Sequence, residues 1–385
     1  MVATQDDARR HVGEVARLFV KLGCIGFGGP AAHIALMRDE VVARRAWVSE
    51  QEFLDLVGAC NLVPGPNSTE LAVHLGLRRA GWRGFIAAAC GFILPAVVIV
   101  LTIAVLYQRY GTTPTALDLS YGIVPVIVAI VAHAVVVLGR TAVKSVQLGV
   151  VMVGTTALWL LGVSELLLLV AGATLTVAWQ QRHRIRGGAA SALVWVPLSA
   201  RWSAGTVAPG DPDLLRLGLV FFKIGAVLYG SGYVLVSFLE RDLVERLGWL
   251  TERQLLDAVA IGQFTPGPVF TTATFVGYQI AGFGGAAVAT IAIFAPAFVF
   301  VALLGRITPI VRRSAVAASA LDGVNAASMG LMAAAAMRLA DSAFIDPLTM
   351  VLGAAALVVL LWRRPNTVWL VAAGALVGLA HGALA

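Results

Sequence analysis

The chain has 385 residues, 59% of them apolar and only 13% charged, with a mean hydropathy of +0.87. A soluble domain carries about 25% charged residues, so a soluble fold of this composition would lack the polar side chains to cover its surface. The composition therefore predicts an all-α protein that crosses a membrane many times. The net charge of +7 is ordinary for such a protein, because Lys and Arg collect in cytoplasmic loops, and no basic-aromatic pattern indicates a nucleic-acid partner.

The N-terminal stretch is charged and lacks the apolar core and cleavage site of a signal peptide, so the first membrane segment is expected to direct insertion. Cys24, Cys60 and Cys90 lie in apolar stretches with no CxxC pair and no ligand spacing around them. This favours packed cysteines over a redox or metal role. No fingerprint of a flavin or nicotinamide cofactor occurs.

Apolar segments follow one another along the chain and divide into two groups. They cover residues 84–107, 119–138, 146–161 and 166–179, then 214–239, 285–304, 315–337, 348–362 and 368–384. The third and fourth are short and predict a tight helical hairpin. Residues 181–213 are rich in Arg, Gly, Pro and Ser and predict a cytoplasmic linker between a first unit, 1–180, and a second, 214–385.

The second unit repeats the first. FVKLGCIGFGG, from Phe19, matches FFKIGAVLYGS, from Phe221, and RRAWVSEQEFLDLV, from Arg44, matches RLGWLTERQLLDAV, from Arg246. The offset is 202 residues, then 201 over the glycines and proline that follow, for nearly eighty residues. Two homologous repeats with interrupted helices at matching positions are the sequence signature of secondary transporters.

A Pro-Gly-Pro triplet interrupts both repeats, at 64–66 and 266–268. Proline removes a backbone donor and disfavours helix in the residue before it, so we expect one half-helix over 53–61 and another over 66–77. Open backbone in a membrane is tolerated only where it lines a protein cavity. Helix propensity alone predicts that three alanines in place of a triplet would restore a continuous helix and leave the protein folded.

The helix that restarts after each triplet is expected to bind an anion, because a helix start has unpaired N–H groups and a partial positive charge. The alternative is that each triplet is a packing kink and the hydroxyl side chains are local caps. The candidate ligands are Asn61, Pro64, Gly65, Pro66, Asn67, Ser68 and Thr69 in the first repeat, and Gln263, Pro266, Gly267, Pro268, Thr271 and Thr272 in the second.

A second pair of breaks, GFGGP at 26–30 and LYGSG at 228–232, adds Gly28, Gly29, Gly230 and Ser231 as candidates. Lys21 and Lys223 precede these breaks at matching positions. A lysine within a span is a functional candidate, although snorkelling to the interface is an equal alternative.

Glu70 and His74 occur only in the first repeat and are candidates for proton coupling; His33 could also relay protons. Glu70 would repel an anion from the first turn of its helix, which fits either a cap or a protonatable group.

The charge distribution favours inverted repeats. If each triplet segment enters the membrane and returns on the same side, most basic residues and the linker fall on one face, as the positive-inside rule requires. Both chain termini would then lie outside, although Arg9 and Arg10 count against this.

The ordered set FGGP, tryptophan loop and PGP, with the loop and PGP repeated, resembles the chromate ion transporter family in its long two-domain form. The resemblance covers roughly residues 15–140 and 215–340. It implies oppositely oriented halves in the cytoplasmic membrane that export chromate, with sulfate as the structural analogue, and that confer chromate resistance through the proton motive force or exchange. LYGSG departs from FGGP, so the halves need not contribute equally.

The expected partners are chromate or sulfate and the lipid bilayer, with a homodimer left open. A membrane enzyme is disfavoured because the spans carry only scattered Lys, Glu and His. A sulfate or other oxyanion carrier and an anion channel remain alternatives.

Overall fold

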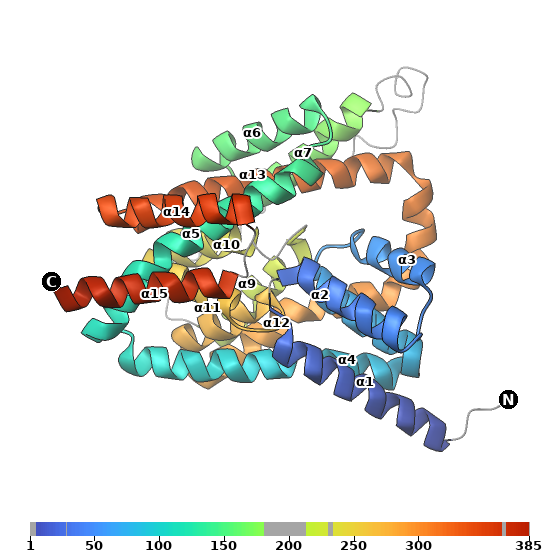
Figure 1. The fold of residues 1–385 in the computed structure, drawn as a ribbon. Coiled ribbons are helices and arrows are strands. Elements are labelled where there is room, and N and C mark those ends of the chain that lie inside the picture. The colour runs from blue at the N-terminus through green and yellow to red at the C-terminus, as the bar shows by residue number, and fades with distance from the viewer. Residues whose placement is uncertain (1–4, 28, 181–212, 230–233, 364–366, 385) are drawn as a thin grey trace.

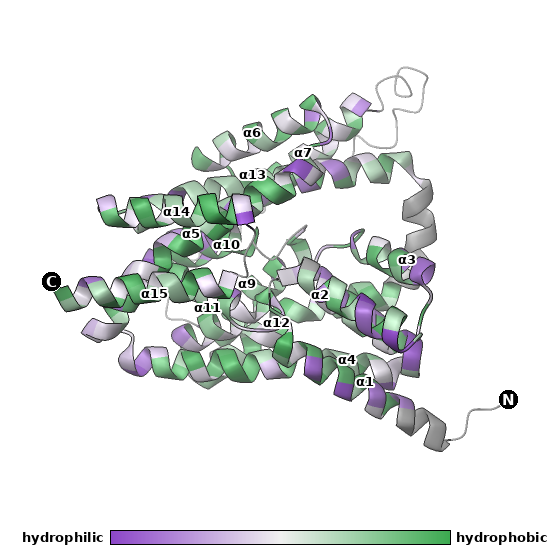
Figure 2. Ribbon diagram, viewed as in Figure 1, coloured by the Kyte–Doolittle hydropathy of each residue, from purple (hydrophilic) through white to green (hydrophobic). Residues whose placement is uncertain are grey.

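The computed structural model describes residues 5–27, 29–180, 213–229, 234–363 and 367–384. These residues form helices joined by short turns, with no strand among them, which confirms the all-α prediction. Four described helices or parts of helices are long and apolar enough to cross a membrane, namely 67–110, 114–142, 269–303 and 367–384. Figure 2 shows hydrophobic residues along these helices and hydrophilic ones gathered where α2 ends, α3 begins and α4 bends.

The described part of the first repeat contains seven helices and one π-helical turn. They are α1 (Gln5–Ile25), α2 (Gly29–Arg38), the π-helical turn η1 (Asp39–Arg44), α3 (Glu50–Cys60), α4 (Asn67–Tyr110), α5 (Pro114–Ala142), α6 (Val146–Leu160) and α7 (Glu165–Gln180).

The second repeat has the same order. It comprises α9 (Leu214–Val227), α10 (Leu235–Leu239), η5 (Glu240–Arg246), α11 (Glu252–Phe264), the 3₁₀ turn η6 (Val269–Thr271), α12 (Thr272–Arg313), α13 (Ala315–Ala343), α14 (Pro347–Arg363) and α15 (Thr367–Leu384). The predicted span 214–239 is wrong as one helix, because the backbone leaves the helical region at Leu228.

Both predicted half-helices around the first triplet are present, as α3 and the start of α4. α4 then bends at Ala80 (φ −141°, ψ 23°) and Gly81 (φ 61°, ψ −153°), and α12 bends with nearly the same angles at Ala281 and Gly282. The duplication is therefore preserved in the backbone as well as in the sequence. The bend divides α4 into two legs, of which the second contains the predicted span 84–107.

Glycine allows the two legs to approach each other closely. A Cβ added at Gly76 would collide with the carbonyl of Gly84, and one added at Gly277 with the carbonyl of Gly285. Helices in a membrane associate through such small residues because lipid provides no hydrophobic driving force between them.

The two repeats run antiparallel and are interleaved (Figure 1). α5 and α13 point in opposite directions, and so do α6 and α14. α5 packs against α14 and α15 of the other repeat, while α13 packs against α6 and α7. The largest buried apolar cluster includes side chains of both repeats, such as Ile130, Phe221 and Phe275.

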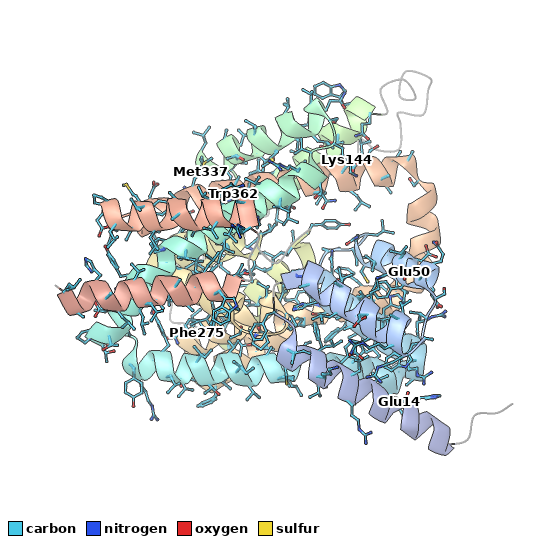
Figure 3. The ribbon with its side chains drawn as sticks, in the orientation of Figure 1. Glu14, Glu50, Lys144, Phe275, Met337 and Trp362 are labelled. Carbon is cyan, nitrogen blue, oxygen red and sulfur yellow. The ribbon has the colours of Figure 1, made fainter. Side chains whose placement is uncertain are left out.

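The termini lie at opposite ends of the molecule (Figure 1), so the expectation of two termini on one face is wrong. α1 begins at the end where α3 begins and α4 bends; Glu14 pairs with Arg79, and Figure 3 shows Glu14 and Glu50 at this end. The reason is that α1 stops half-way along the second leg of α4, with Gly23 against Phe92, and α2 turns back. We call this end the basic face, since Arg38, Arg44 and Arg45 also lie here.

Glycine also sets the crossings between the repeats. A Cβ at Gly122 would collide with the carbonyl of Gly374, and one at Gly323 with the carbonyl of Gly172. These contacts join α5 to α15 and α13 to α7 at equivalent positions. The bundle therefore depends on backbone-to-backbone approach where the halves meet.

Gly122→Ala should destabilise the protein by about 1 to 3 kcal/mol, because the added methyl group forces α5 and α15 apart. Gly154→Ala in α6 is the matched control: no atom lies within 4 Å of its Cβ position, and helix propensity favours alanine by about 1 kcal/mol. Thermal unfolding in detergent measures both. Equal melting temperatures for the two variants would contradict the close crossing.

Candidate functional site

The breaks of the two repeats meet in the middle of the bundle and are joined by two backbone hydrogen bonds. The N–H of Gly65 donates to the carbonyl of Leu228 over 2.8 Å, and the N–H of Gly267 donates to the carbonyl of Gly26 over 2.8 Å. Both donors and both acceptors are related by the 202-residue offset. Each triplet thus binds the glycine-rich break of the other repeat, and we call this pair of bonds the reciprocal clasp.

Glycine is required in the clasp by its conformation and its surroundings. Gly65 has φ +142° and Gly267 has φ +95°, values that L-residues rarely adopt. A Cβ at Gly65 would collide with Glu70 Oε1, and one at Gly267 would lie 2.6 Å from the Cβ of Ala96. These φ values and contacts argue against the expectation that three alanines leave the protein folded, because tertiary contacts oppose helix propensity here.

The start of α4 has no side-chain cap. Pro66 occupies the cap position and accepts from the N–H groups of Thr69 and Glu70 through its carbonyl. Asn67 donates from Nδ2 to Oδ1 of Asn61 over 2.6 Å, at the exposed edge of the break. The first-turn amides are thus left without the hydroxyl or carboxylate that usually caps a helix.

Three polar side chains of this turn are buried. Ser68, Thr69 and Glu70 are at most 3% exposed. Thr69 Oγ1 and both carboxyl oxygens of Glu70 have no hydrogen-bond partner among the described residues, and neither does Nδ1 of His74 one turn later. Buried polar groups are normally paired, so this cluster is the outstanding candidate for a binding site.

Residues that sequence reasoning did not select complete the surroundings. Tyr229 donates its hydroxyl to the carbonyl of Asn61 over 2.9 Å, and both Cys60 and Tyr229 lie within electrostatic range of Glu70. Their only sequence signal is proximity to the breaks, since Cys60 ends α3 and Tyr229 belongs to LYGSG.

The second triplet is built differently. Thr271 and Thr272 donate their hydroxyls to the carbonyls of Pro268 and Val269, each over 2.8 Å. The expectation that both hydroxyls donate to an anion is not met, because the turn uses them itself. Gln263 lies half-buried beside Thr272 at a small cavity lined mainly by apolar side chains.

Lys21 and Lys223 lie in ion pairs and not in the cluster around Glu70. Lys21 donates to Glu40 over 2.7 Å, and Lys223 pairs with Asp242, nineteen residues later in both repeats. Lys21 is the main cause that lowers the pKa of Glu40, which also binds Arg45. The lysines thus stabilise equivalent turns.

Of the glycine-rich candidates, Gly29 begins α2 with φ +78°. Gly28, Gly230 and Ser231 lie outside the described residues.

The comparisons with known proteins agree with the duplication. The family model described as "Chromate transporter" matches residues 13–177 and again 215–379. The chain belongs to the chromate transporter family.

Two relatives illustrate the match. The "Chromate transport protein" of Cupriavidus metallidurans is 31% identical over 95% of this chain and 92% of its own length. The "Probable chromate transport protein" of Synechococcus elongatus is 31% identical over 90% of this chain and 88% of its own. No solved structure matches.

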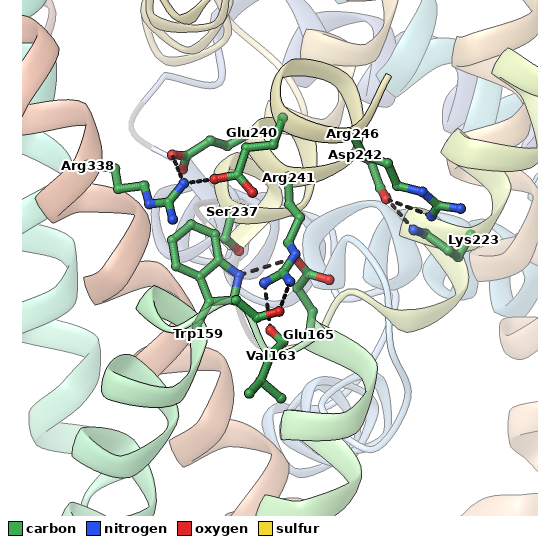
Figure 4. A network of polar contacts seen from close by, with 12 residues as sticks. Trp159, Val163, Glu165, Lys223, Ser237, Glu240, Arg241, Asp242, Arg246 and Arg338 are labelled. Carbon is green, nitrogen blue, oxygen red and sulfur yellow. Dashed lines mark hydrogen bonds and ion pairs between the residues drawn. The ribbon is translucent and has the colours of Figure 1, made fainter. Parts of the chain in front are cut away.

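A second polar network joins the repeats at the face opposite the basic face (Figure 4). Arg241 of η5 donates to the carbonyls of Gly162 and Val163 in the turn between α6 and α7, and it pairs with Glu165 over 3.4 Å. Arg338 of α13 stacks on Trp159 and lies 4.0 Å from Glu240. This network fixes η5, in the second repeat, to the α6–α7 hairpin of the first repeat.

Glu240 of this network should titrate near neutral pH. It is 3% exposed, its Oε2 has no partner among the described residues, and burial raises its pKa to about 7. A glutamate in an unfolded chain titrates near about 4.3. The unfolded chain therefore releases this proton at lower pH than the folded protein does.

Glu240 should lower the free energy of unfolding by roughly 3 kcal/mol as pH rises from about 5 to 8, because a raised carboxyl pKa stabilises the fold only below that pKa. Glu240→Gln should remove this contribution and make the pH slope shallower, whereas Glu50→Gln at an exposed position should retain it. Chemical unfolding in micelles at both pH values measures the difference. An unchanged pH slope in Glu240→Gln would refute the assignment.

Proposed function

We propose that the chain is a secondary active transporter that exports chromate across the cytoplasmic membrane and thereby confers chromate resistance. The observation that carries the proposal is the start of α4. There an uncapped helix end and unpartnered, buried Thr69 and Glu70 lie where the breaks of two inverted repeats meet. The names of the relatives support chromate as the substrate.

Chromate is a tetrahedral dianion whose oxygens accept hydrogen bonds from all directions. The N–H groups of Asn67 and Ser68 at the start of α4 and the side chains of Asn67 and Thr69 provide donors, and the helix end adds a partial positive charge in place of a full one. Such a site binds with moderate affinity, which allows release.

Glu70 must be protonated while chromate is bound. A carboxylate about 5 Å from a dianion would be repelled by roughly 7 kcal/mol at an effective dielectric constant of about 20. This repulsion is comparable to the entire free energy of binding of a ligand with micromolar affinity. Protonation removes the repulsion and adds a donor. His74, one turn along α4 toward the basic face, would then exchange the proton with the cytoplasm.

One cycle would carry a dianion and a proton outward, so one net negative charge moves. A membrane potential that is negative inside favours this by about 2.3 kcal/mol per 100 mV. Export would therefore be driven by the electrical part of the proton motive force.

In this proposal the two hairpins of each repeat, α1 with α2 and α3 with the first leg of α4, enter the membrane and return, and the basic face is cytoplasmic. A sulfate or other oxyanion carrier would use the same donors, and an anion channel would use them without coupled exchange.

Uptake of labelled chromate into inverted vesicles, with and without an imposed potential and with sulfate as competitor, tests the function. We expect saturable uptake that the potential accelerates. Equal saturation by sulfate would favour the general oxyanion carrier, and flux without saturation or coupling would favour the channel.

Glu70→Gln should separate binding from coupling. Glutamine keeps the shape and a donor but cannot release a proton, so chromate binding should persist within about threefold while chromate-dependent proton movement disappears. A pH-sensitive dye in proteoliposomes measures proton movement. Glu50→Gln is the matched control and should behave as the wild type; proton movement that persists in Glu70→Gln would leave Glu70 as a buried structural acid.

Cysteines at the helix caps Ser49 and Thr251 should report opposite sides of the membrane. The two residues begin α3 and α11 at matching positions of antiparallel repeats. In intact cells of a cysteine-free background, a membrane-impermeant maleimide should label only the Thr251 variant, and in inverted vesicles only the Ser49 variant. Labelling of both from one side would contradict the orientation.

A further inference from the structure

His33 of α2 connects the start of α4 with the reciprocal clasp. Its Nε2 lies 2.9 Å from the carbonyl oxygen of Gly26, and its Nδ1 lies 3.3 Å from Oγ of Ser68. The ring is 2% exposed and packs edge-on against Phe92. Two hydrogen bonds and one aromatic contact therefore fix its position.

These contacts determine where the ring carries its hydrogen. A carbonyl oxygen can only accept, so Nε2 must be the donor to Gly26. In neutral imidazole Nδ1 is then an acceptor, and Ser68 must donate its hydroxyl hydrogen to it. Ser68 consequently has no hydrogen left to donate to another group while His33 is neutral, and only its lone pairs remain free.

We propose that His33 is a positioning residue that switches Ser68 between acceptor and donor toward the anion. A proton on Nδ1 reverses the hydrogen bond, so that His33 donates to Ser68 Oγ and the hydroxyl hydrogen turns to the substrate. The proposal rests on the proposed anion site at the start of α4 and adds a second, separate proton control to it.

The same ring links both triplets. The carbonyl of Gly26 accepts from His33 and also from the N–H of Gly267 in the second repeat. A chain of contacts thus runs from Ser68, which follows the first triplet, through His33 and Gly26 to the second triplet. The state of the anion site is thereby connected to one bond of the clasp.

The switch belongs to one repeat only. With the offset of 202 residues, Leu235 stands where His33 does and Phe270 where Ser68 does, and both are buried. The clasp is symmetric, whereas the group that can titrate beside it is not. A role in packing alone would be served equally by the apolar pair that the second repeat uses.

Several charged groups on the elements packed against α2 are engaged in ion pairs. Lys21 of α1 pairs with Glu40 of η1, and on α4 Arg78 pairs with Glu52 and Arg79 with Glu14. Arg38 of α2 itself pairs with Glu50. Arg17 of α1 and Arg83 of α4 are exposed. Glu70 and His74 follow Ser68 on the same helix, so a test must separate His33 from these two.

Nitrogen NMR of histidine-labelled protein tests the switch without substrate. The His33 signals are assigned by their loss in His33→Gln, in which the carboxamide can still donate to Gly26. We expect the Nε2–H tautomer at alkaline pH and both nitrogens protonated at acid pH. An Nδ1–H tautomer, or a ring that never titrates between pH 5 and 9, would overturn the proposal.

Equilibrium chromate binding in a Glu70→Gln, His74→Gln background tests the consequence. Affinity should rise as pH falls. Ser68→Ala should lower affinity by about tenfold at acid pH and leave it unchanged at alkaline pH, where the hydroxyl is already engaged by His33. The purely Coulombic effect of an imidazolium would survive this substitution, so the difference isolates the hydroxyl.

In the Glu70→Gln, His74→Gln background, adding His33→Gln should give the same chromate affinity at every pH, equal to that of the background at alkaline pH. Ser237→Ala, a buried serine that donates to its own helix, is the control and should retain the pH dependence. A loss in Ser68→Ala that is equal at both pH values would overturn the switch alone. If neither the wild type nor the variants bind chromate saturably at any pH, the proposed function is overturned. The role of Ser68 toward the anion is then overturned too, whatever the NMR result.

Discussion

Two hydrogen bonds between backbones, from Gly65 to Leu228 and from Gly267 to Gly26, hold the molecule together at its centre. A chain that opens its helices inside an apolar bundle must pair the exposed N–H and C=O groups, because each unpaired group costs several kcal/mol there. The N–H groups of Gly65 and Gly267 both find their acceptors in the other repeat. Each uses the other, and this requirement explains why a duplicated chain folds as one interleaved unit.

The rest of the packing follows from that requirement. Each triplet can reach the break of the other repeat because the two repeats run antiparallel and their helices pack at short distance. Glycine pairs such as Gly122 with Gly374 and Gly172 with Gly323 permit this approach where long helices cross. The network around Arg241 then fixes the outer turn of the second repeat to the α6–α7 hairpin of the first.

A functional asymmetry is built on this symmetric frame. The first repeat has His33, Ser68, Thr69 and Glu70 beside its triplet, whereas the second places Leu235 and Phe270 there and uses its threonine hydroxyls within the turn. In the proposed mechanism the first repeat binds substrate and protons, while the second supplies the matching half of the clasp. The symmetric clasp comes from the duplication, whereas the polar side chains beside the first triplet come from divergence of the two repeats.

The sequence by itself determined the elements that depend on local composition and on comparison of the halves. Apolar length predicted the spans, Pro-Gly-Pro predicted the break between α3 and α4, and the offset of 202 residues predicted the duplication, since these signals lie in neighbouring residues or in identical letters. It also selected Glu70, Ser68 and Thr69, because they follow a proline at a helix start.

Only the tertiary structure decided what each selected residue contacts. Lys21 and Lys223 look like site residues by position, yet their partners Glu40 and Asp242 stand nineteen residues later on a turn whose direction α2 and α10 set. Alanines in place of a triplet look harmless by propensity, yet the positive φ of Gly65 and its contact with Glu70 exclude a side chain. His33 was one polar residue among several until folding placed its ring between Ser68 and Gly26. Packing of the helices determines which residues far apart in the chain form hydrogen bonds, and the local sequence pattern does not indicate these partners.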